Sequence, residues 1–268
     1  MKGELWLPFF LQESNDGNRS IFMDKSKVNI DDTNISLDLS DATQAVKENR
    51  FQDAILLLER ILKDQPDNID ALYLSAVSSR YLKKFDESKS YIMDLLSNAP
   101  DMGRAYQEYG HLNRDQGNEE KAVMHYRQAC ELNPALLASW SFLHQYFTKY
   151  KNKPAADHAE DQLKKLKSLP GLLLYISQIL NEGRLGLAEE KCRAFLKKNP
   201  TNTYAMSLLA EIANRLGYFD DAEFLLEKAV EFSPDDGDLR TKYAEILRKK
   251  QKFSKTMEQV EILCEKFP

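Results

Sequence analysis

Apolar residues recur in short helical stripes that repeat along the chain with a period of about 34 residues. One stripe consists of Phe51, Ala54, Leu58 and Ile61, spaced as on one face of an amphipathic helix, and Pro66 follows it. Its small residue recurs at intervals of 34, 34, 34, 32, 34 and 34 residues, as Ala54, Ser88, Ala122, Ala156, Ala188, Ala222 and Thr256. The proline recurs as Pro66, Pro100, Pro134, Pro200, Pro234 and Pro268. Two agreeing series of positions predict a tandem array in which each repeat is a pair of helices.

This periodicity predicts an all-α fold and a division of the chain. We expect an N-terminal extension, residues 1–34, followed by repeats at 35–68, 69–102, 103–136, 137–168, 169–202, 203–236 and 237–268. The fourth repeat lacks the final proline and is two residues short, so an irregularity is expected at residues 150–170. In the fifth repeat the apolar positions of the first helix hold Leu172, Tyr175 and Ile179.

The third repeat carries a recognisable spacing. It places these residues at the positions of an aromatic, a small pair, a turn glycine, alanine, an aromatic, alanine and proline: Tyr106, Tyr109, Gly110, Gly117, Ala122, Tyr126, Ala129 and Pro134. The chain thereby resembles a tetratricopeptide repeat (TPR) protein. The resemblance implies a right-handed superhelical solenoid of about seven helix-turn-helix repeats. The small residues at Gly110 and Ala122 would let the two helices of a repeat approach closely.

Residues 1–34 do not follow the period. Residues 13–34 are polar and contain turn-forming residues, which predicts a linker. The first twelve residues do not form a signal peptide, because Glu4 and Pro8 interrupt the apolar run and no cleavage pattern follows. We expect the apolar group Leu5, Trp6, Leu7, Phe9, Phe10 and Leu11 to dock on the array; a disordered tail and a contact with a membrane or partner are the alternatives.

Composition narrows the class of protein. The net charge of −5 argues against general nucleic-acid binding, and no apolar run reaches the roughly 20 residues needed to cross a bilayer. Cys130, Cys192 and Cys264 stand far apart with no C-x-x-C motif, which favours a reducing, cytoplasmic environment. Cys192 occupies a core position of its repeat and is expected to be buried.

The sequence offers no catalytic or metal-binding constellation. The four histidines, His111, His125, His144 and His158, show none of the spacings of a metal site. Gly110, Gly117, Gly183 and Gly217 each fall at a packing or turn position of a repeat and do not form a phosphate-binding loop. We therefore expect neither an enzyme nor a cofactor, and we look for function on the helix surface.

In TPR arrays the first helix of each repeat lines an inner groove, at about positions 2, 5, 9, 12 and 13. In the second to fourth repeats these positions hold a basic and aromatic set: Tyr73, Arg80, Tyr81, Arg104, Gln107, His111, Arg114, Gln145 and Lys149. The set predicts a groove that binds an extended, acidic segment of a protein or peptide. The alternative is that these cations only pair with neighbouring carboxylates, including Asp115.

Two further comparisons of residues refine this prediction. The lysine and asparagine four residues apart that clamp chaperone C-termini are absent, since the equivalent positions hold residues such as Gln107 and His111. Residues 109–129, 138–143, 169–196, 205–235 and 247–253 resemble the N-terminal TPR region of bacterial TPR-sulfotransferases. Those proteins transfer a sulfuryl group from 3′-phosphoadenylyl sulfate with a separate domain, whose phosphosulfate-binding loop does not occur in residues 1–268. A scaffold is the first hypothesis, and the substrate-recruiting half of such an enzyme is the alternative.

The last predicted helix has no polar capping helix after it. Val260 and Leu263 would then present apolar ridges to water. We expect either that the native gene product continues beyond Pro268 or that this face mediates self-association.

Overall fold

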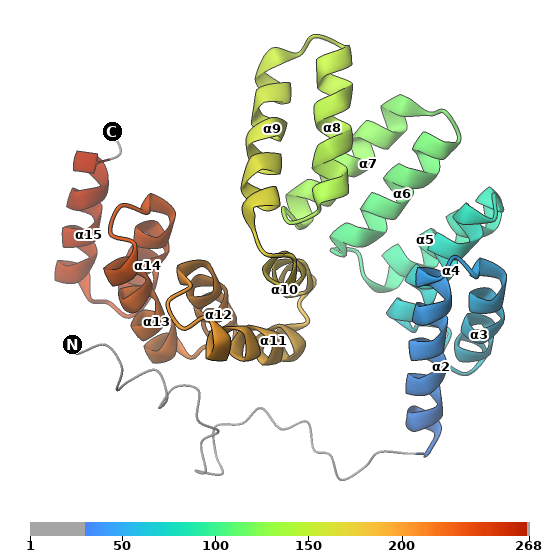
Figure 1. Ribbon diagram of the computed structural model, residues 1–268, viewed down its shortest axis with the longest axis horizontal. Coiled ribbons are helices and arrows are strands. Elements are labelled where there is room, and N and C mark those ends of the chain that lie inside the picture. The colour runs from blue at the N-terminus through green and yellow to red at the C-terminus, as the bar shows by residue number, and fades with distance from the viewer. Residues whose placement is uncertain (1–29, 267–268) are drawn as a thin grey trace. The chain divides into compact units, whose positions relative to one another are not determined.

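The computed structural model describes residues 30–266, and of residues 30–34 and 36 it describes the backbone only. The predicted docking of the apolar group around Trp6 lies outside these residues. Within them the chain is helical, with no strand, and its 14 helices form seven consecutive pairs (Figure 1). The prediction of an all-α array of seven helix pairs is confirmed. The helices are α2 (Ile30–Lys47), α3 (Phe51–Asp64), α4 (Ile69–Tyr81), α5 (Phe85–Asn98), α6 (Gly103–Asp115), α7 (Glu119–Leu132), α8 (Leu137–Lys149), α9 (Lys153–Ser168), α10 (Gly171–Asn181), α11 (Leu185–Lys198), α12 (Thr203–Arg215), α13 (Phe219–Phe232), α14 (Gly237–Lys249) and α15 (Phe253–Lys266).

The described residues divide into two compact modules between Pro170 and Gly171. The N-terminal module, residues 30–170, holds α2 to α9, and the C-terminal module, residues 171–266, holds α10 to α15. Each pair consists of a first helix and a second helix that pack against each other, and successive pairs pack in chain order within each module. The division falls at the edge of the region where the sequence predicted an irregularity.

The structure relocates the two-residue shortening. First and second helices begin 16 residues apart in α8 and α9, at 137 and 153, but only 14 apart in α10 and α11, at 171 and 185. The shortening therefore lies in α10, and the boundary between the fourth and fifth repeats follows Pro170 instead of Ser168. Pro170 stands two residues after the end of α9, as Pro134 does after α7, because proline cannot continue a helix. Pro154 lies in the first turn of α9, where its missing N–H is tolerated.

The first helix also starts earlier than predicted. α2 begins at Ile30, so the end of the segment predicted as a linker is helical. The sequence D-D-T-N at 31–34 suggested a turn, but Asp, Thr and Asn are also favoured near the beginning of a helix. Composition alone does not separate the two cases.

The turn inside each pair contains one residue with positive φ. Glycine holds this position at Gly117, Gly183 and Gly217, with φ of 79°, 76° and 81°. Other residues hold it in the remaining four pairs, at Asn49, Lys83, Lys151 and Gln251. In the third pair the N–H of Asn118 donates to the carbonyl of Asn113, a bond that satisfies the end of α6 and requires the left-handed residue between them.

The close approach of the two helices in a pair is confirmed. A Cβ atom at Gly110 would lie 2.8 Å from the ring of Tyr126, and both Ala122 and Tyr126 are fully buried. The Tyr126 ring packs against Phe142 of the next pair, with ring centroids 4.4 Å apart. Cys192 is fully buried as predicted, and its thiol donates to the carbonyl of Ala205 at 3.1 Å.

Not all apolar positions of the first helix of the fifth repeat are buried in α10. Leu172 and Tyr175 are 42% and 41% exposed, whereas Leu173 and Ile176 are fully buried. The equivalent residues of α12, Met206 and Leu209, are buried where α12 packs on the preceding α11. No helix precedes α10 within the C-terminal module, so the apolar pattern of α10 does not decide which of its faces is covered.

Candidate partner-binding face

The first helices α4, α6 and α8 of the N-terminal module lie side by side and are joined by side chains. The guanidinium of Arg104 on α6 lies over the ring of Tyr73 on α4, 4.8 Å from its centroid. The hydroxyl of Ser139 on α8 donates to Gln107 on α6 at 3.0 Å. We call this surface the first-helix face; it consists of the predicted residues on α4, α6 and α8 and the side chains that link them.

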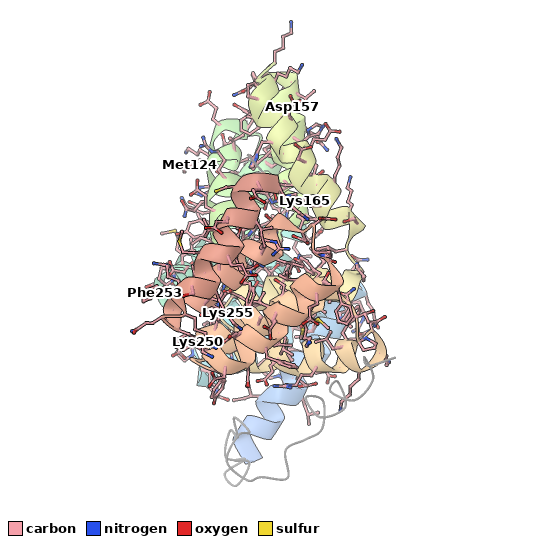
Figure 2. All side chains as sticks on the ribbon, turned by 90° about the vertical axis from the view of Figure 1, so that its left-hand side faces the viewer. Met124, Asp157, Lys165, Lys250, Phe253 and Lys255 are labelled. Atoms are coloured by element: carbon pink, nitrogen blue, oxygen red, sulfur yellow. The ribbon has the colours of Figure 1, made fainter. Side chains whose placement is uncertain are left out.

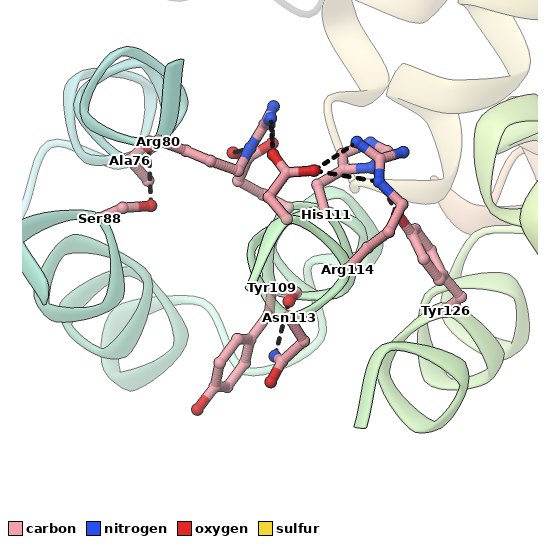
Figure 3. A network of polar contacts seen from close by, with 10 residues as sticks. Ala76, Arg80, Ser88, Tyr109, His111, Asn113, Arg114 and Tyr126 are labelled. Atoms are coloured by element: carbon pink, nitrogen blue, oxygen red, sulfur yellow. Dashed lines mark hydrogen bonds and ion pairs between the residues drawn. The ribbon is translucent and has the colours of Figure 1, made fainter. Parts of the chain in front are cut away.

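Arg80 is the centre of a buried ionic network between α4 and α6 (Figure 3). Its Nε donates to Glu108 at 2.5 Å, and its Nη1 donates to Asp115 at 2.8 Å. Arg80 and Glu108 are only 6% and 3% exposed. Arg114 extends the network outward, because its guanidinium also donates to Asp115, at 2.9 Å. A buried ion pair with these bonds fixes the two helices relative to each other, although its desolvation offsets much of the attraction.

The charges in this network shift the pKa values of its members. Burial raises the pKa of the Glu108 carboxyl even though Arg80 acts to lower it. Burial also acts to raise the pKa of Asp115, but hydrogen bonds from Arg80 and Arg114 outweigh it and leave that pKa below its usual range. Burial acts to lower the pKa of Arg80, and the two carboxylates more than reverse this. Arg80 and Asp115 therefore stay charged at neutral pH.

His111 belongs to the interior of the helix pair. Its Nδ1 and the Tyr126 hydroxyl are hydrogen-bonded at 2.5 Å, with the rings edge to face (Figure 3). Burial, and then the positive charges of Arg80 and Arg114, lower the pKa of His111 to about 3. The imidazole is therefore neutral at physiological pH and contributes no positive charge to the surface.

The other predicted residues differ in how far they are engaged within the chain. The ring of Tyr81 stacks on Phe51, with centroids 4.5 Å apart, and also lies beneath the guanidinium of Arg80. Lys149 pairs with Glu119 of α7 at 2.7 Å, but both side chains are about half exposed. Gln145 is exposed on α8.

The sequence analysis did not identify Glu108, the carboxylate that pairs with the buried Arg80. Glu108 lies on the side of α6 that faces other helices, where an apolar residue is expected. A charged residue at a core position was the available signal, because such a residue needs a buried partner of opposite charge. Counting charges on the first-helix face gives four cations, Arg80, Arg104, Arg114 and Lys149, and three carboxylates, Glu108, Asp115 and Glu119.

Residues 30–266 contain neither a cluster of metal ligands nor a membrane-spanning helix. No group of three or more histidine, cysteine, aspartate or glutamate side chains there could hold a metal ion. No helix in the same range is long and apolar enough to span a membrane.

Comparison with known families identifies the repeats. Residues 103–136 match one tetratricopeptide repeat model, and residues 180–246 match a second one. The two matches fall in different modules, so both modules contain tetratricopeptide repeats. No curated protein is significantly similar to the chain.

Several solved structures are similar at low sequence identity. The MamA protein is 14% identical with a TM-score of 0.42, over 76% of this chain and 93% of that one. A thermophilic tetratricopeptide repeat protein of Thermus thermophilus is 22% identical with a TM-score of 0.36, over 80% and 98%. A tetratricopeptide repeat protein of Parabacteroides merdae is 15% identical with a TM-score of 0.43, over 88% and 94%. Similarities at this level carry no argument about function.

Proposed function

We propose that this tetratricopeptide repeat protein is an interaction scaffold that binds an extended, acidic segment of a partner protein on the first-helix face. Tetratricopeptide repeats generally mediate protein–protein interactions and are typically non-catalytic. The observation that supports this site is the linkage of three consecutive first helices by their own side chains, with Arg104, Arg114 and Lys149 distributed over α6 and α8.

The spacing of the helices suits an extended ligand. Adjacent packed helices lie about 8 to 10 Å apart, and an extended chain advances about 3.3 Å per residue. A ligand crossing α6 and α8 would therefore meet successive cations about every three residues. A segment with an acidic side chain at every third residue fits this spacing.

The proposed face has a fixed part and a part available to a ligand. Arg80 and His111 are held by buried partners, so they position α4, α6 and α7 and are not proposed as ligand contacts. Arg114 and Lys149 are 43% and 57% exposed and pair with partly exposed carboxylates. Such surface pairs contribute little to stability, so a ligand carboxylate can replace them at small cost.

Charge reversal of Arg104 and Arg114 tests this site. The probe is a labelled peptide with glutamate at every third residue. Arg104→Glu with Arg114→Glu should weaken its binding at least tenfold, and binding to the unaltered chain should weaken with added salt. The matched control is Lys121→Glu with Arg127→Glu, which changes net charge equally at exposed positions of α7. If both double variants lose affinity equally, or neither does, this face is not the binding site.

The resemblance to TPR-sulfotransferases supports a second proposal. According to this proposal, these repeats recruit the acceptor substrate for a sulfotransferase domain in another part of the same polypeptide. An assay of the full gene product for sulfuryl transfer from 3′-phosphoadenylyl sulfate decides the matter. Absence of transfer to any protein or small-molecule acceptor would leave the scaffold alone.

A further inference from the structure

Helix α15 carries an exposed apolar stripe. Phe253, Met257 and Val260 are 63%, 56% and 38% exposed, and Cys264 is exposed beside them. Their spacing of four, three and four residues places them on one face of the helix. Figure 2 shows Phe253 projecting from the start of this helix. Single exposed apolar residues are common on protein surfaces, but four on one helix face form a contiguous patch, and such patches mark interaction sites.

The second helix of the preceding pair, α13, shows what covers the same face there. The equivalent residues of α13 are Phe219, Glu223, Leu226 and Val230. Leu226 is 2% exposed and Glu223 is 7% exposed, because the following first helix, α14, packs on α13. Met257 and Val260, the central part of the stripe, therefore occupy the surface that a first helix covers elsewhere in the same module, whereas Phe219, the equivalent of Phe253, is 38% exposed.

One edge of the stripe is acidic. Glu258, Glu261 and Glu265 are exposed, and none of them forms an ion pair within residues 30–266. The lysines at and near α15 are already engaged: Lys252 pairs with Glu223, Lys255 with Glu227 and Lys266 with Asp235. The unused charge beside the stripe is thus entirely negative.

The internal helix pair indicates how a covering helix can donate a hydrogen bond to this edge. Glu227 on α13 is equivalent to Glu261 on α15. Glu227 accepts a hydrogen bond at 3.2 Å from the hydroxyl of Tyr243, which belongs to the covering helix α14. A covering helix thus supplies both apolar side chains and a donor for this glutamate.

We propose that α15 is a second docking surface, which binds an amphipathic basic helix of a partner protein in the manner in which α14 covers α13. The apolar side of that helix would cover Met257 and Val260. Its lysine or arginine side chains would lie along Glu258, Glu261 and Glu265.

Charge favours this occupant over a second copy of the chain and over residues 1–12. In an antiparallel two-fold pairing of two copies, each edge of α15 meets the same edge of its partner, so the glutamates would repel one another. Residues 1–12 of the chain are apolar, but they carry one lysine and one glutamate and are interrupted by Pro8, so their sequence does not provide a basic helix.

A peptide with the sequence of residues 237–252 serves as the probe. It contains α14 and the basic residues after it, so it has the chemistry that already covers α13. We expect this labelled peptide to bind the full chain, and binding to weaken at least tenfold in Met257→Asp with Val260→Asp. Met124→Asp is the matched control, because Met124 is 57% exposed on α7, and it should leave binding unchanged.

The acidic edge has its own test. Glu258→Lys with Glu261→Lys should weaken peptide binding and remove its dependence on salt. Helix content by circular dichroism should stay unchanged in all these variants, because the altered side chains are exposed.

Three outcomes would overturn the proposal. The first is failure of the peptide to bind. The second is a dimer of the chain, seen by sedimentation, that Met257→Asp dissociates, which makes a second copy the occupant. The third is at least tenfold tighter peptide binding after removal of residues 1–29, which makes that segment the occupant. None of these results depends on the first-helix face, so the two proposals fail separately.

Discussion

In the C-terminal module the buried apolar side chains form one continuous cluster that runs from Leu173 on α10 to Leu247 on α14. Among the described residues of the N-terminal module they form four smaller clusters, centred on residues such as Leu58, Leu72, Ile92 and Tyr126. Both modules are built from the same helix pairs, so the difference comes from the residues at equivalent positions.

The N-terminal module holds a buried ion pair between two first helices. Arg80 and Glu108 are both buried, and the bond between them joins α4 to α6. Such bonds define one arrangement of neighbouring helices while adding little net stability. The repeat pattern sets the architecture of both modules, whereas the buried ion pair fixes the geometry of α4 and α6.

The last helices of the two modules differ as well. Asp157, Glu160 and Lys164 on α9 are equivalent to Met257, Val260 and Cys264 on α15. The face of α9 is thus polar, with Lys164 and Glu160 paired at 3.0 Å, and is suited to water. The docking proposed for α15 therefore has no counterpart on α9, where the equivalent side chains are charged.

The largest effect should come from breaking the buried ion pair of the N-terminal module. Glu108→Gln leaves the Arg80 guanidinium buried without its main counter-charge, so we expect a destabilisation of about 3 to 5 kcal/mol. Denaturant unfolding followed by Trp140 fluorescence, with Trp6 replaced by phenylalanine, reports on this module. The control is Arg80→Met with Glu108→Leu, which should recover much of the loss. An unchanged midpoint for Glu108→Gln would show that Asp115 alone satisfies Arg80.

A fall in pH should destabilise the N-terminal module more than the C-terminal module, and the size of this effect should be intermediate. The pKa of His111 is lowered from 6.5 to about 3, so the unfolded chain binds a proton that the folded chain excludes between these values. The contribution of His111 to stability is complete above pH 6.5 and is lost as pH falls, by at most about 1.4 kcal/mol per pH unit. Residues 171–266 contain no histidine, so the C-terminal module lacks this dependence.

Hydrogen exchange at pH 6.5 and at pH 5 measures both modules in one experiment. Protection of amides in α6 and α7 should fall at the lower pH, and His111→Gln should reduce that fall. Equal pH dependence in His111→Gln and in the unaltered chain would rule out His111 as its source.

The smallest effect concerns the turns. The N-terminal module places lysine or asparagine at three of its four positive-φ positions, whereas the C-terminal module places glycine at two of three. Lys83→Gly should stabilise the N-terminal module by about 0.5 to 1 kcal/mol, and Gly217→Lys should destabilise the C-terminal module by a similar amount. Thermal unfolding of each variant measures both shifts. Lys84→Gly, next to the turn, is the control and should not stabilise.

The sequence alone determined the helix pairs and their internal packing. The period of 34 residues located the seven pairs, and the small residues Gly110 and Ala122 predicted the close approach that the structure shows. Burial of Cys192 followed from the same period. These features are local, since they depend on residues within one repeat and its immediate neighbour.

Only the tertiary structure decided which helix faces are covered and which charges are buried. Periodicity shows that Leu172, Tyr175 and Met257 lie on apolar faces, but their exposure depends on which helices pack against α10 and α15. It also placed Arg80 on a first helix without revealing that Glu108, 28 residues away, takes up its charge. A helical pattern specifies a face, whereas burial and the pairing of charges depend on what lies against that face.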